Sequence, residues 1–374
     1  MPKIAFLMLI SDRGKMVTAL IGVIFSVVLV NLQGGLFVGL IKKASLLVSN
    51  CEADIWVGHR QIHNVDFPSN IPRVWLNRIK GIPDVQSAEP YVVGFTEMTL
   101  PSGGFEGVIV VGVDPKSLMG NAWNIVEGES QSVLRHNGII VDLCDQKKLE
   151  SPELGEMREI GGLRARVVAK SKGITGFLVN PYVFTTEQRA HQFVKMPVNQ
   201  CSYFLVKTLP GSNLDEVVRE IKKHVPLAEV LTKEQYSWIS INYWLTRTGI
   251  GISFGAATVL GLLVGLVMVA QTLYAFVLDR LTEFGTLKAI GASGPQLMCI
   301  LLIQALIIAV IGSIFGLIIS VFVQTFFSTP RSPIIIPFFV KALSCVLVTA
   351  ICMASSLLPY LKVRNLDPQY VIQS

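Results

Sequence analysis

Charged residues are scarce in this sequence, because Asp, Glu, Lys and Arg together make up only 16% of its 374 residues. Soluble globular domains carry roughly 25%, and disordered chains combine high charge with few apolar residues. Here 51% of the residues are hydrophobic, and the mean hydropathy is +0.54. The scarcity of charge argues against an ordinary soluble enzyme and a disordered chain, and it predicts a membrane protein.

Clusters of like charge are also missing. The net charge of +6 is spread thinly, without a run of five or more basic residues. A nucleic-acid-binding protein concentrates basic residues on one face or in one segment. We therefore expect no nucleic-acid partner.

Motifs for nucleotide binding, catalysis and metal binding are missing as well. Gly14-Lys15 is followed by Met16 and does not fit the phosphate loop G-x-x-x-x-G-K-[ST]. His59 and His63 have the spacing of two ligands on one helix face, but no third ligand is near and the segment reads as a loop. We expect no catalytic residue, no metal and no cofactor bound by this chain, so any ATP would be used by a partner.

Acidic residues are absent from four apolar stretches, and each is long enough to cross a bilayer, which takes about 20 residues. The first is longer than the core of a cleaved signal, about 7–15 residues, and is expected to be retained. The predicted spans are residues 17–41, 249–278, 298–327 and 337–361.

Charge is concentrated between the first two spans, where residues 42–248 hold 45 of the 58 charged side chains. This segment predicts a mixed α/β domain inserted into a four-helix membrane scaffold. Strands are expected at 54–57, 108–113, 138–141, 164–169, 203–207 and 227–231. The remaining segments are 1–16 and 362–374 as cytoplasmic ends, 279–297 as a cytoplasmic loop and 328–336 as an outer loop.

Two helices are expected near the end of this domain. Ser212 or Asn213 can cap a helix over 214–224. Thr232 can cap a second helix, which is expected to run as a stalk through Trp238 and Tyr243-Trp244 straight into the second span. These aromatic residues are typical of an interfacial belt.

Basic residues near the span ends indicate the orientation. Seven lie on the inner side and five on the outer side if the N-terminus is cytoplasmic, a weak positive-inside bias. It places residues 42–248 outside the cytoplasm, and the opposite topology stays open on counting alone.

The loop between the second and third spans is unusually patterned. Leu281, Phe284, Leu287 and Lys288 fall at helical spacing, and Gly291 can end the helix in the left-handed conformation. The pattern predicts a short amphipathic helix at the cytoplasmic surface. On spacing alone, it could serve only to pin the loop at the interface.

The run T-E-F-G-T-L-K-A-I-G-A-S at 282–293 resembles the signature R-E-I-G-x-L-[KR]-A-[IL]-G-A-S of the MacB/FtsX-type family of ABC-transporter permeases. It departs from that signature at Thr282 and Phe284. The plan of one helix, a large outer domain and three further helices is similar to the family over the whole chain. Asn50–Asp54 and Asn242–Trp244 most closely resemble the DevC-type branch, the heterocyst glycolipid exporter-like permeases.

The resemblance implies a permease of the inner membrane that acts as a lever for a separate ABC ATPase, which supplies the ATP-driven motion. It implies export of a lipid or other amphiphile, a homodimer, a membrane-fusion adaptor and an outer-membrane channel. An FtsX-like relay that regulates an extracellular cell-wall hydrolase is the alternative, and a membrane-anchored enzyme is a third. The implied ATPase-coupling residues are Glu283, Phe284, Gly285, Leu287, Lys288 and Gly291.

Polar and small residues inside the spans suggest helix contacts. Asn31, Gln33, Gln271, Gln304 and Gln324 are costly against lipid and are expected to form interhelical hydrogen bonds. Small residues spaced by four permit close helix approach. They suggest a dimer seam through the second span at Gly251, Gly255, Gly261 and Gly265.

Six cysteines are divided evenly between the spans and the outer domain. Cys299, Cys345 and Cys352 are expected to be packing residues. An odd number in the outer domain allows at most one internal disulfide, and the pairing is left open among Cys51, Cys144 and Cys201.

Overall fold

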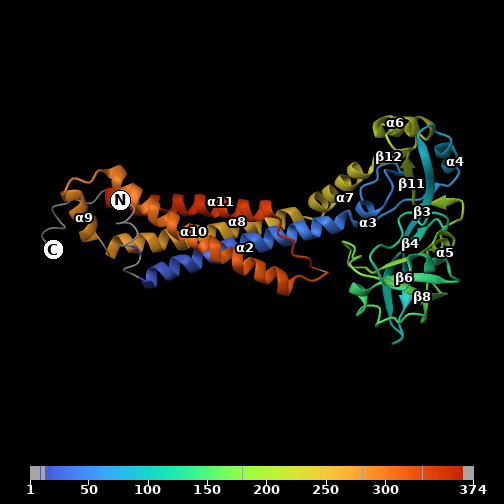
Figure 1. Ribbon diagram of the computed structural model, residues 1–374, viewed down its shortest axis with the longest axis horizontal. Coiled ribbons are helices and arrows are strands. Elements are labelled where there is room, and N and C mark those ends of the chain that lie inside the picture. The colour runs from blue at the N-terminus through green and yellow to red at the C-terminus, as the bar shows by residue number, and fades with distance from the viewer. Residues whose placement is uncertain (1–8, 10–12, 179, 280, 331, 365–374) are drawn as a thin grey trace. The chain divides into compact units, whose positions relative to one another are not determined.

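The computed structural model describes residues 9, 13–178, 180–279, 281–330 and 332–364 (Figure 1). The chain forms two compact units: a helical unit, built from the chain up to Gly39 and from Ile250 onward, and an α/β unit between Leu40 and Gly249. This division confirms the predicted fold class of four long apolar helices, one N-terminal and three C-terminal, around an inserted α/β domain.

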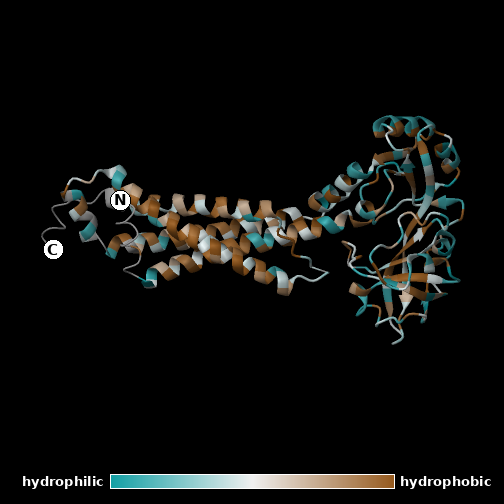
Figure 2. Ribbon diagram, in the orientation of Figure 1, coloured by the Kyte–Doolittle hydropathy of each residue, from teal (hydrophilic) through white to brown (hydrophobic). Residues whose placement is uncertain are grey.

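The helical unit contains the helices that are long and apolar enough to cross a membrane. Figure 2 shows their predominantly hydrophobic composition. The last of them bends at Ser356, which lies between two helical segments. The bounds are α2 Arg13–Ala44, α8 Ile250–Asp279, α10 Gly294–Phe327, α11 Phe338–Ser355 and α12 Leu357–Arg364, with the short α9 Leu281–Ala289 between α8 and α10.

Glycines let α2 pack closely against both α8 and α10. A Cβ added at Gly265 of α8 would overlap the side chain of Ser26, and one at Gly316 of α10 would lie 2.7 Å from Cβ of Val27. The same crowding recurs one helical turn away on each helix, at Gly261 against Leu29 and at Gly312 against Val23. Two small-residue pairs spaced by four therefore both face α2.

This packing bears on the predicted dimer seam. Gly261 and Gly265 make their close approach within the chain, against α2, so the spacing that suggested a contact between subunits is already used. Gly255 differs, because an added Cβ would meet no described atom within 4 Å. The seam through Gly251, Gly255, Gly261 and Gly265 stays a prediction, and Gly255 has the most space for a second subunit.

A hydrogen bond between helices confirms the expected role of Asn31. Its Nδ2 donates to the hydroxyl of Ser344 at 2.8 Å and joins α2 to α11. Gln304 of α10 is also buried, with 3% of its surface exposed. Gln271, in contrast, is exposed on α8, where lipid or another subunit would meet it.

The α/β unit is built on a mixed ten-stranded sheet. Its strands follow the order β12-β1-β11-β3-β4-β9-β6-β8-β5, β7 pairs with β3 and β8, and β10 pairs separately with β2. The bounds are β1 Ile55–His59, β2 Ile71–Pro72, β3 Val85–Thr99, β4 Phe105–Val113, β5 Ile125–Glu127, β6 Gly138–Asp142, β7 Met157–Ile160, β8 Leu163–Ser171, β9 Tyr182–Thr186, β10 Gln200–Cys201, β11 Tyr203–Thr208 and β12 Ala228–Thr232.

Alternating side chains give this sheet two hydrophobic cores. In β1, Ile55 and Val57 enter one core and Trp56 enters the other, as a period of two requires. The first core is covered by α4 Trp75–Lys80, α5 Glu187–Phe193 and α6 Leu214–His224, and the second by α3 Leu46–Asn50 and α7 Lys233–Arg247. Burial on both faces explains why the central strands contain continuous apolar runs.

The predicted helix starts in this unit are confirmed. Asn213 caps α6 by accepting a hydrogen bond from the backbone N–H of Asp215 at 3.1 Å. Thr232 and Gln235 form a capping box at the start of α7. Both helices begin where side chains satisfy backbone N–H groups that have no partner within the helix.

The expected continuous helix from Thr232 into the second span is wrong. α7 ends at Arg247, Gly249 has a φ of +69°, and α8 begins at Ile250. A positive φ is incompatible with a right-handed helix and is readily adopted by glycine. Unbroken helix occurs instead in α2, whose 32 residues exceed the roughly 20 needed to span a bilayer.

Candidate functional site

The segment that resembles a coupling element forms a short helix with a defined end. After α9, Gly291 has a φ of +102°, the N–H of Gly291 donates to Lys288 O at 3.1 Å, and that of Ala292 donates to Leu287 O at 2.9 Å. These bonds terminate the helix as the sequence predicts. Ser293 and Gln296 then form a capping box that starts α10, so the turn is fixed on both sides.

Leu287 fixes this helix to the rest of the helical unit. Its side chain packs against a cluster formed by Val277 of α8 and by Leu297, Ile300 and Leu301 of α10. Leu287 is only partly buried, so it attaches α9 to the helical unit and its contact with an ATPase stays a prediction.

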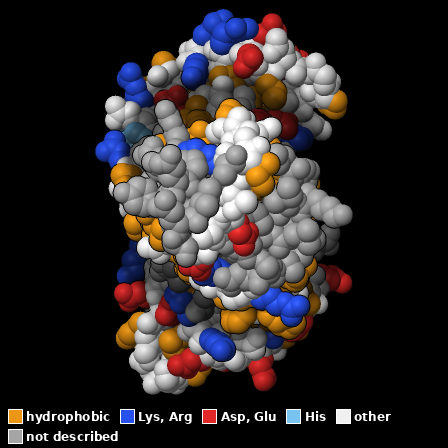
Figure 3. Space-filling model, turned by 90° about the vertical axis from the view of Figure 1, so that its left-hand side faces the viewer, with side chains coloured by type: hydrophobic (Ala, Val, Ile, Leu, Met, Phe, Trp, Pro, Cys, Tyr) orange, Lys and Arg blue, Asp and Glu red, His pale blue; other side chains and the backbone are white. Residues whose placement is uncertain are grey.

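Other side chains of this segment are exposed to solvent. Glu283 and Thr286 are exposed, and Ile290 exposes 80% of its surface. Spacings of three and four residues place these side chains on one face of a helix. Figure 3 faces this end of the helical unit and shows acidic and hydrophobic side chains at its surface.

Ile290 was missed in the sequence analysis, although a large apolar residue just before a helix-ending glycine is a usable signal. Of the other predicted coupling residues, Lys288 is half-buried and Gly291 is exposed. The side chain of Phe284 and the environment of Gly285 lie outside the described part of the structure. The ends of α8 and α2 are joined nearby by an ion pair between Asp279 and Lys15.

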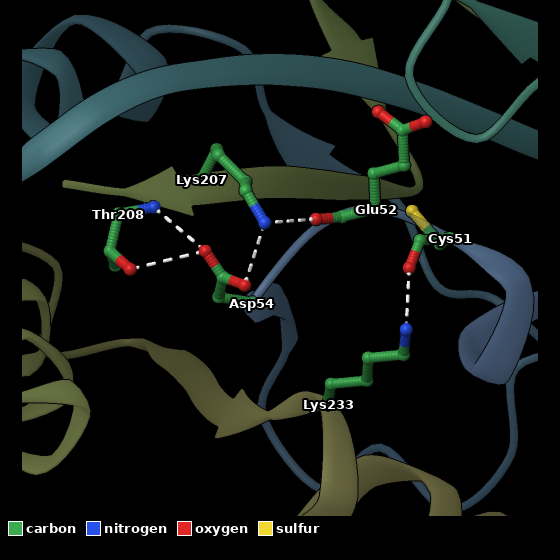
Figure 4. A network of polar contacts seen from close by, with 6 residues as sticks. All are labelled: Cys51, Glu52, Asp54, Lys207, Thr208 and Lys233. Carbon is green, nitrogen blue, oxygen red and sulfur yellow. Dashed lines mark hydrogen bonds and ion pairs between the residues drawn. The ribbon is translucent and has the colours of Figure 1, made fainter. Parts of the chain in front are cut away.

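A polar network joins the two points where the chain enters and leaves the sheet of the α/β unit (Figure 4). The carboxylate of Asp54 accepts hydrogen bonds from Lys207 Nζ at 2.9 Å and from Thr208 N at 3.0 Å. Lys233, the first residue of α7, donates from Nζ to the carbonyl of Cys51 at 2.7 Å. The segment that follows α3 is therefore tied both to β11 and to the start of α7.

Electrostatics keep Asp54 ionised in this network. Partial burial by itself would raise its pKa, but hydrogen bonds from Thr208 N, the ammonium of Lys207 and the Thr208 hydroxyl outweigh that effect and lower the pKa. Bonds that favour the charged form have this sign. Asp54 therefore holds its partners as a carboxylate at neutral pH.

The predicted aromatic belt is corrected for Trp244. This residue is 7% exposed and stacks on Phe177 with ring centroids 4.0 Å apart. Tyr243 stacks on His63 at 6.3 Å. Both belong to the packing of the α/β unit, whereas Trp238 is 63% exposed and its interfacial role stays a prediction.

The remaining candidates do not come together. Within the described ranges, no group of three His, Cys, Asp or Glu side chains is arranged to hold a metal ion. Cys51, Cys144 and Cys201 are free thiols. Burial raises the pKa of the Cys51 thiol to about 11 and that of Cys201 to about 12, so neither is a reactive thiolate.

Four membrane-length helices around an inserted α/β domain, with a short helix between the second and third, define the class of a multi-pass membrane protein. The model of the MacB-like periplasmic core domain matches residues 16–224, and that of the FtsX-like permease C-terminal domain matches residues 255–368. The chain belongs to the MacB/FtsX-like family of ABC-transporter permeases.

Solved structures similar to the α/β unit were also found. They are the periplasmic region of MacB from Actinobacillus actinomycetemcomitans (9% identity, TM-score 0.39, 49% of this chain and 90% of that one) and the extracellular domain of the noncanonic ABC-type transporter YknZ from Gram-positive bacteria (12%, 0.36, 48% and 98%). A third is a domain of a permease protein from Porphyromonas gingivalis (14%, 0.33, 48% and 88%). The comparison with curated proteins gave no match.

Family membership has consequences for the whole chain. It is a multi-pass membrane protein, and its α/β unit is a periplasmic core domain. Permeases of this family rely on an ABC ATPase.

Proposed function

We propose that this permease is the lever of an exporter of the inner membrane. A separate ABC ATPase moves α9, the helical unit passes this motion on, and the periplasmic core domain expels a lipid or other amphiphile. A homodimer, a membrane-fusion adaptor and an outer-membrane channel complete the proposed assembly, as in DevC-type permeases. The chain itself binds no nucleotide in this proposal.

The observation that supports the proposal is that α9 is attached to the helical unit while several side chains of α9 and of the residue after it stay exposed. Leu287 anchors it on α8 and α10, while Glu283, Thr286 and Ile290 remain exposed. A helix that only pinned a loop at the interface would direct its large apolar residues into lipid or into its own bundle. An exposed charge beside an exposed isoleucine instead suits a protein partner, with the apolar residue as anchor and the charge as selector.

The network around Asp54 supports the far end of the same path. A push on the chain after α3 reaches Lys207 in β11 and Lys233 in α7 through short polar bonds. The entry and exit points of the domain would then move as one body. The break at Gly249 makes α2 the stiffer of the two connections in this mechanism.

Two substitutions test the ATPase contact. Glu283→Lys combined with Lys288→Glu, and separately Ile290→Ser, should lower permease-dependent stimulation of the ATPase by about tenfold, the effect of losing a hot-spot contact. The ATPase is identified by copurification in mild detergent, and its activity is measured with each permease variant in liposomes. Insertion and folding of the permease should be unchanged.

Matched controls are available in the α/β unit. Lys222 and Glu229 lie 3.7 Å apart, so reversing both charges repeats the double change away from α9. Leu227 is 63% exposed, and Leu227→Ser matches Ile290→Ser. Normal stimulation by both α9 variants would remove the coupling assignment. Copurification of a cell-wall hydrolase instead of an adaptor would favour the FtsX-like relay over export.

A further inference from the structure

A large cleft lies beside α5 in the periplasmic core domain, far along the chain from α9. Its volume is about 800 Å³. It is bordered by the end of α4, by the segments that follow β4 and α5, and by α5 itself. We name it the α5 cleft, and its wall includes the basic residues Arg73, Lys80, Lys116 and Lys195 and the apolar residues Leu76 and Met196.

Basic side chains outnumber acidic ones in the lining of the α5 cleft. The wall has two acidic residues, Asp114 and Glu187, and both are engaged within the domain. Glu187 is 5% exposed and pairs with Arg73. Asp114 accepts a hydrogen bond from the backbone N–H of Lys116 at 2.8 Å. The anions therefore organise the wall and leave an excess of positive charge facing the cleft.

Arg73 is held in place from behind. Its Nη2 donates a hydrogen bond to Oε2 of Glu187 at 3.1 Å, and its Nη1 lies 2.5 Å from Oε1 in an ion pair. A guanidinium has five N–H donors, and this hydrogen bond uses one of them. With 36% of its side chain exposed, Arg73 can direct further donors into the cleft.

His191 completes this support. It is 4% exposed, and its Nδ1 lies 3.2 Å from the carbonyl of Met196. Its Nε2 lies 3.4 Å from Oε1 of Glu187 and has no hydrogen-bond partner within the described structure. A buried imidazole and a buried carboxylate thus sit behind Arg73. Such a preorganised arginine is typical of a site for a planar or tetrahedral anion.

Three lysines add positive charge to the wall, and of these Lys80 also interacts electrostatically with Glu89. Among the described residues, no carboxylate lies within 4.0 Å of the ammonium groups of Lys80, Lys116 or Lys195. Like charges around one hollow raise its positive potential and the local concentration of anions. The α5 cleft therefore favours ligands that carry negative charge.

Apolar surface lies beside these charges. Leu76 and Met196 line the same cleft, and Val198 on its rim exposes 71% of its surface. An exposed apolar rim would not contribute to the binding of a small hydrophilic anion. Charge and apolar surface together match a ligand that has both.

We propose that the α5 cleft binds an anionic amphiphile, through a phosphate or carboxylate head at Arg73 and the three lysines and an adjoining hydrocarbon segment at Leu76, Met196 and Val198. This deepens the proposed export function by giving the chemical class of the exported molecule, and only its biological meaning rests on that function. Binding itself needs neither the ATPase nor α9.

Hexyl phosphate is a suitable probe, because it carries the proposed head group and remains soluble in water. It is titrated calorimetrically into the full-length permease in phosphatidylcholine nanodiscs. We expect inorganic phosphate and hexanol, which each offer half of the ligand, to bind at least about tenfold more weakly. Raising the ionic strength from about 0.05 M to about 0.5 M should weaken binding of hexyl phosphate, because it screens the lysines.

The substitutions avoid the buried pair and keep the domain folded. Lys80→Gln, Lys116→Gln and Lys195→Gln together should lower the affinity for hexyl phosphate by about tenfold or more. Lys147→Gln, Lys172→Gln and Lys222→Gln remove the same charge outside the cleft and should leave affinity within about twofold.

Several results would overturn this assignment. Equal affinity in the two triple variants would place the site elsewhere, and equal affinity for inorganic phosphate or for hexanol would reduce it to a plain anion site or an apolar groove. Displacement of hexyl phosphate by a lower concentration of hexaglutamate would identify an acidic protein segment as the occupant. A failed test of α9 would leave these binding results unchanged, so the two proposals fail separately.

Discussion

Gly265→Leu is expected to prevent assembly of the helical unit, whereas Gly255→Leu on the same helix should be tolerated. A Cβ at Gly265 would already overlap Ser26 of α2, and Gly255 has open space in the described structure. Overpacking a close contact costs about 1–3 kcal/mol or more. Lipid gives helices no hydrophobic drive to reassemble, so packing at small residues decides the association.

The comparison is read from purified protein in mild detergent. The Gly265→Leu variant should elute as aggregate or melt well below the parent, and the Gly255→Leu variant should elute as a single species with the parent's melting temperature. A folded, fully active Gly265→Leu protein would contradict the α2–α8 contact. If Gly255 lies in a homodimer seam, its variant should shift from dimer to monomer without losing its fold.

Much of this architecture could be predicted because a bilayer imposes length and composition. Four stretches of sufficient apolar length could be located without knowing any contact. Helix caps could be predicted equally well, because Asn213 and Thr232 bind backbone groups only two or three residues away. Local physics determines features of this kind.

Features that depend on a partner far away in the sequence could not be predicted from the sequence. The spacing of Gly261 and Gly265 predicts that another helix packs closely against α8. It does not identify that helix as α2 or as a helix of a second subunit. Leu287 likewise has the same spacing whether it faces α10 or an ATPase. The long strand β3 was missed because Pro90 and Gly94 interrupt its pattern, although Pro90 sits opposite Phe204 in the sheet.

The break after α7 is another feature that the sequence did not predict. Thr248 and Gly249 stand between a polar helix and an apolar one, and a single glycine is often tolerated within a helix. Its φ of +69° is a property of the folded chain. The sequence therefore predicted both helices but not the break between them.

A buried carboxyl group in the periplasmic core domain is expected to make the stability of that domain depend on pH. Asp66 is 1% exposed, and its Oδ1 accepts a hydrogen bond from the hydroxyl of Tyr182 at 2.5 Å. Burial raises its pKa to about 6, although the bond from Tyr182 opposes that shift. The nearby Phe67 contacts Tyr243 and Trp244 of α7, so this carboxyl lies under the segment that packs on α7.

The direction of the pH effect follows from the two protonation states. Because the pKa of Asp66 is higher in the folded state than its ordinary value of 3.8, the native state holds the proton more tightly than the unfolded chain. The stability contributed by the protonated group is fully present below pH 3.8 and is lost as the pH rises through about 6. At pH 7.5 the ionised carboxylate therefore costs on the order of 3 kcal/mol.

Asp66→Asn should remove this cost, because the amide oxygen still accepts from Tyr182 and carries no charge. We expect the variant to be more stable than the parent at pH 7.5 by about 1–3 kcal/mol, and the difference to vanish toward pH 4. The difference between variant and parent at each pH is the informative quantity, because carboxylates with lowered pKa, such as Asp54, give the whole protein an opposite slope.

Tryptophan fluorescence isolates this measurement within the full-length chain. All five tryptophans, at 56, 75, 123, 238 and 244, lie in the α/β unit, so a melt followed at their emission reports that unit and not the helices. Leu227→Ser serves as an exposed, uncharged control that should shift the melt equally at every pH. A stability difference for Asp66→Asn that stays constant from pH 4 to pH 7.5 would show that Asp66 does not change its charge in this range.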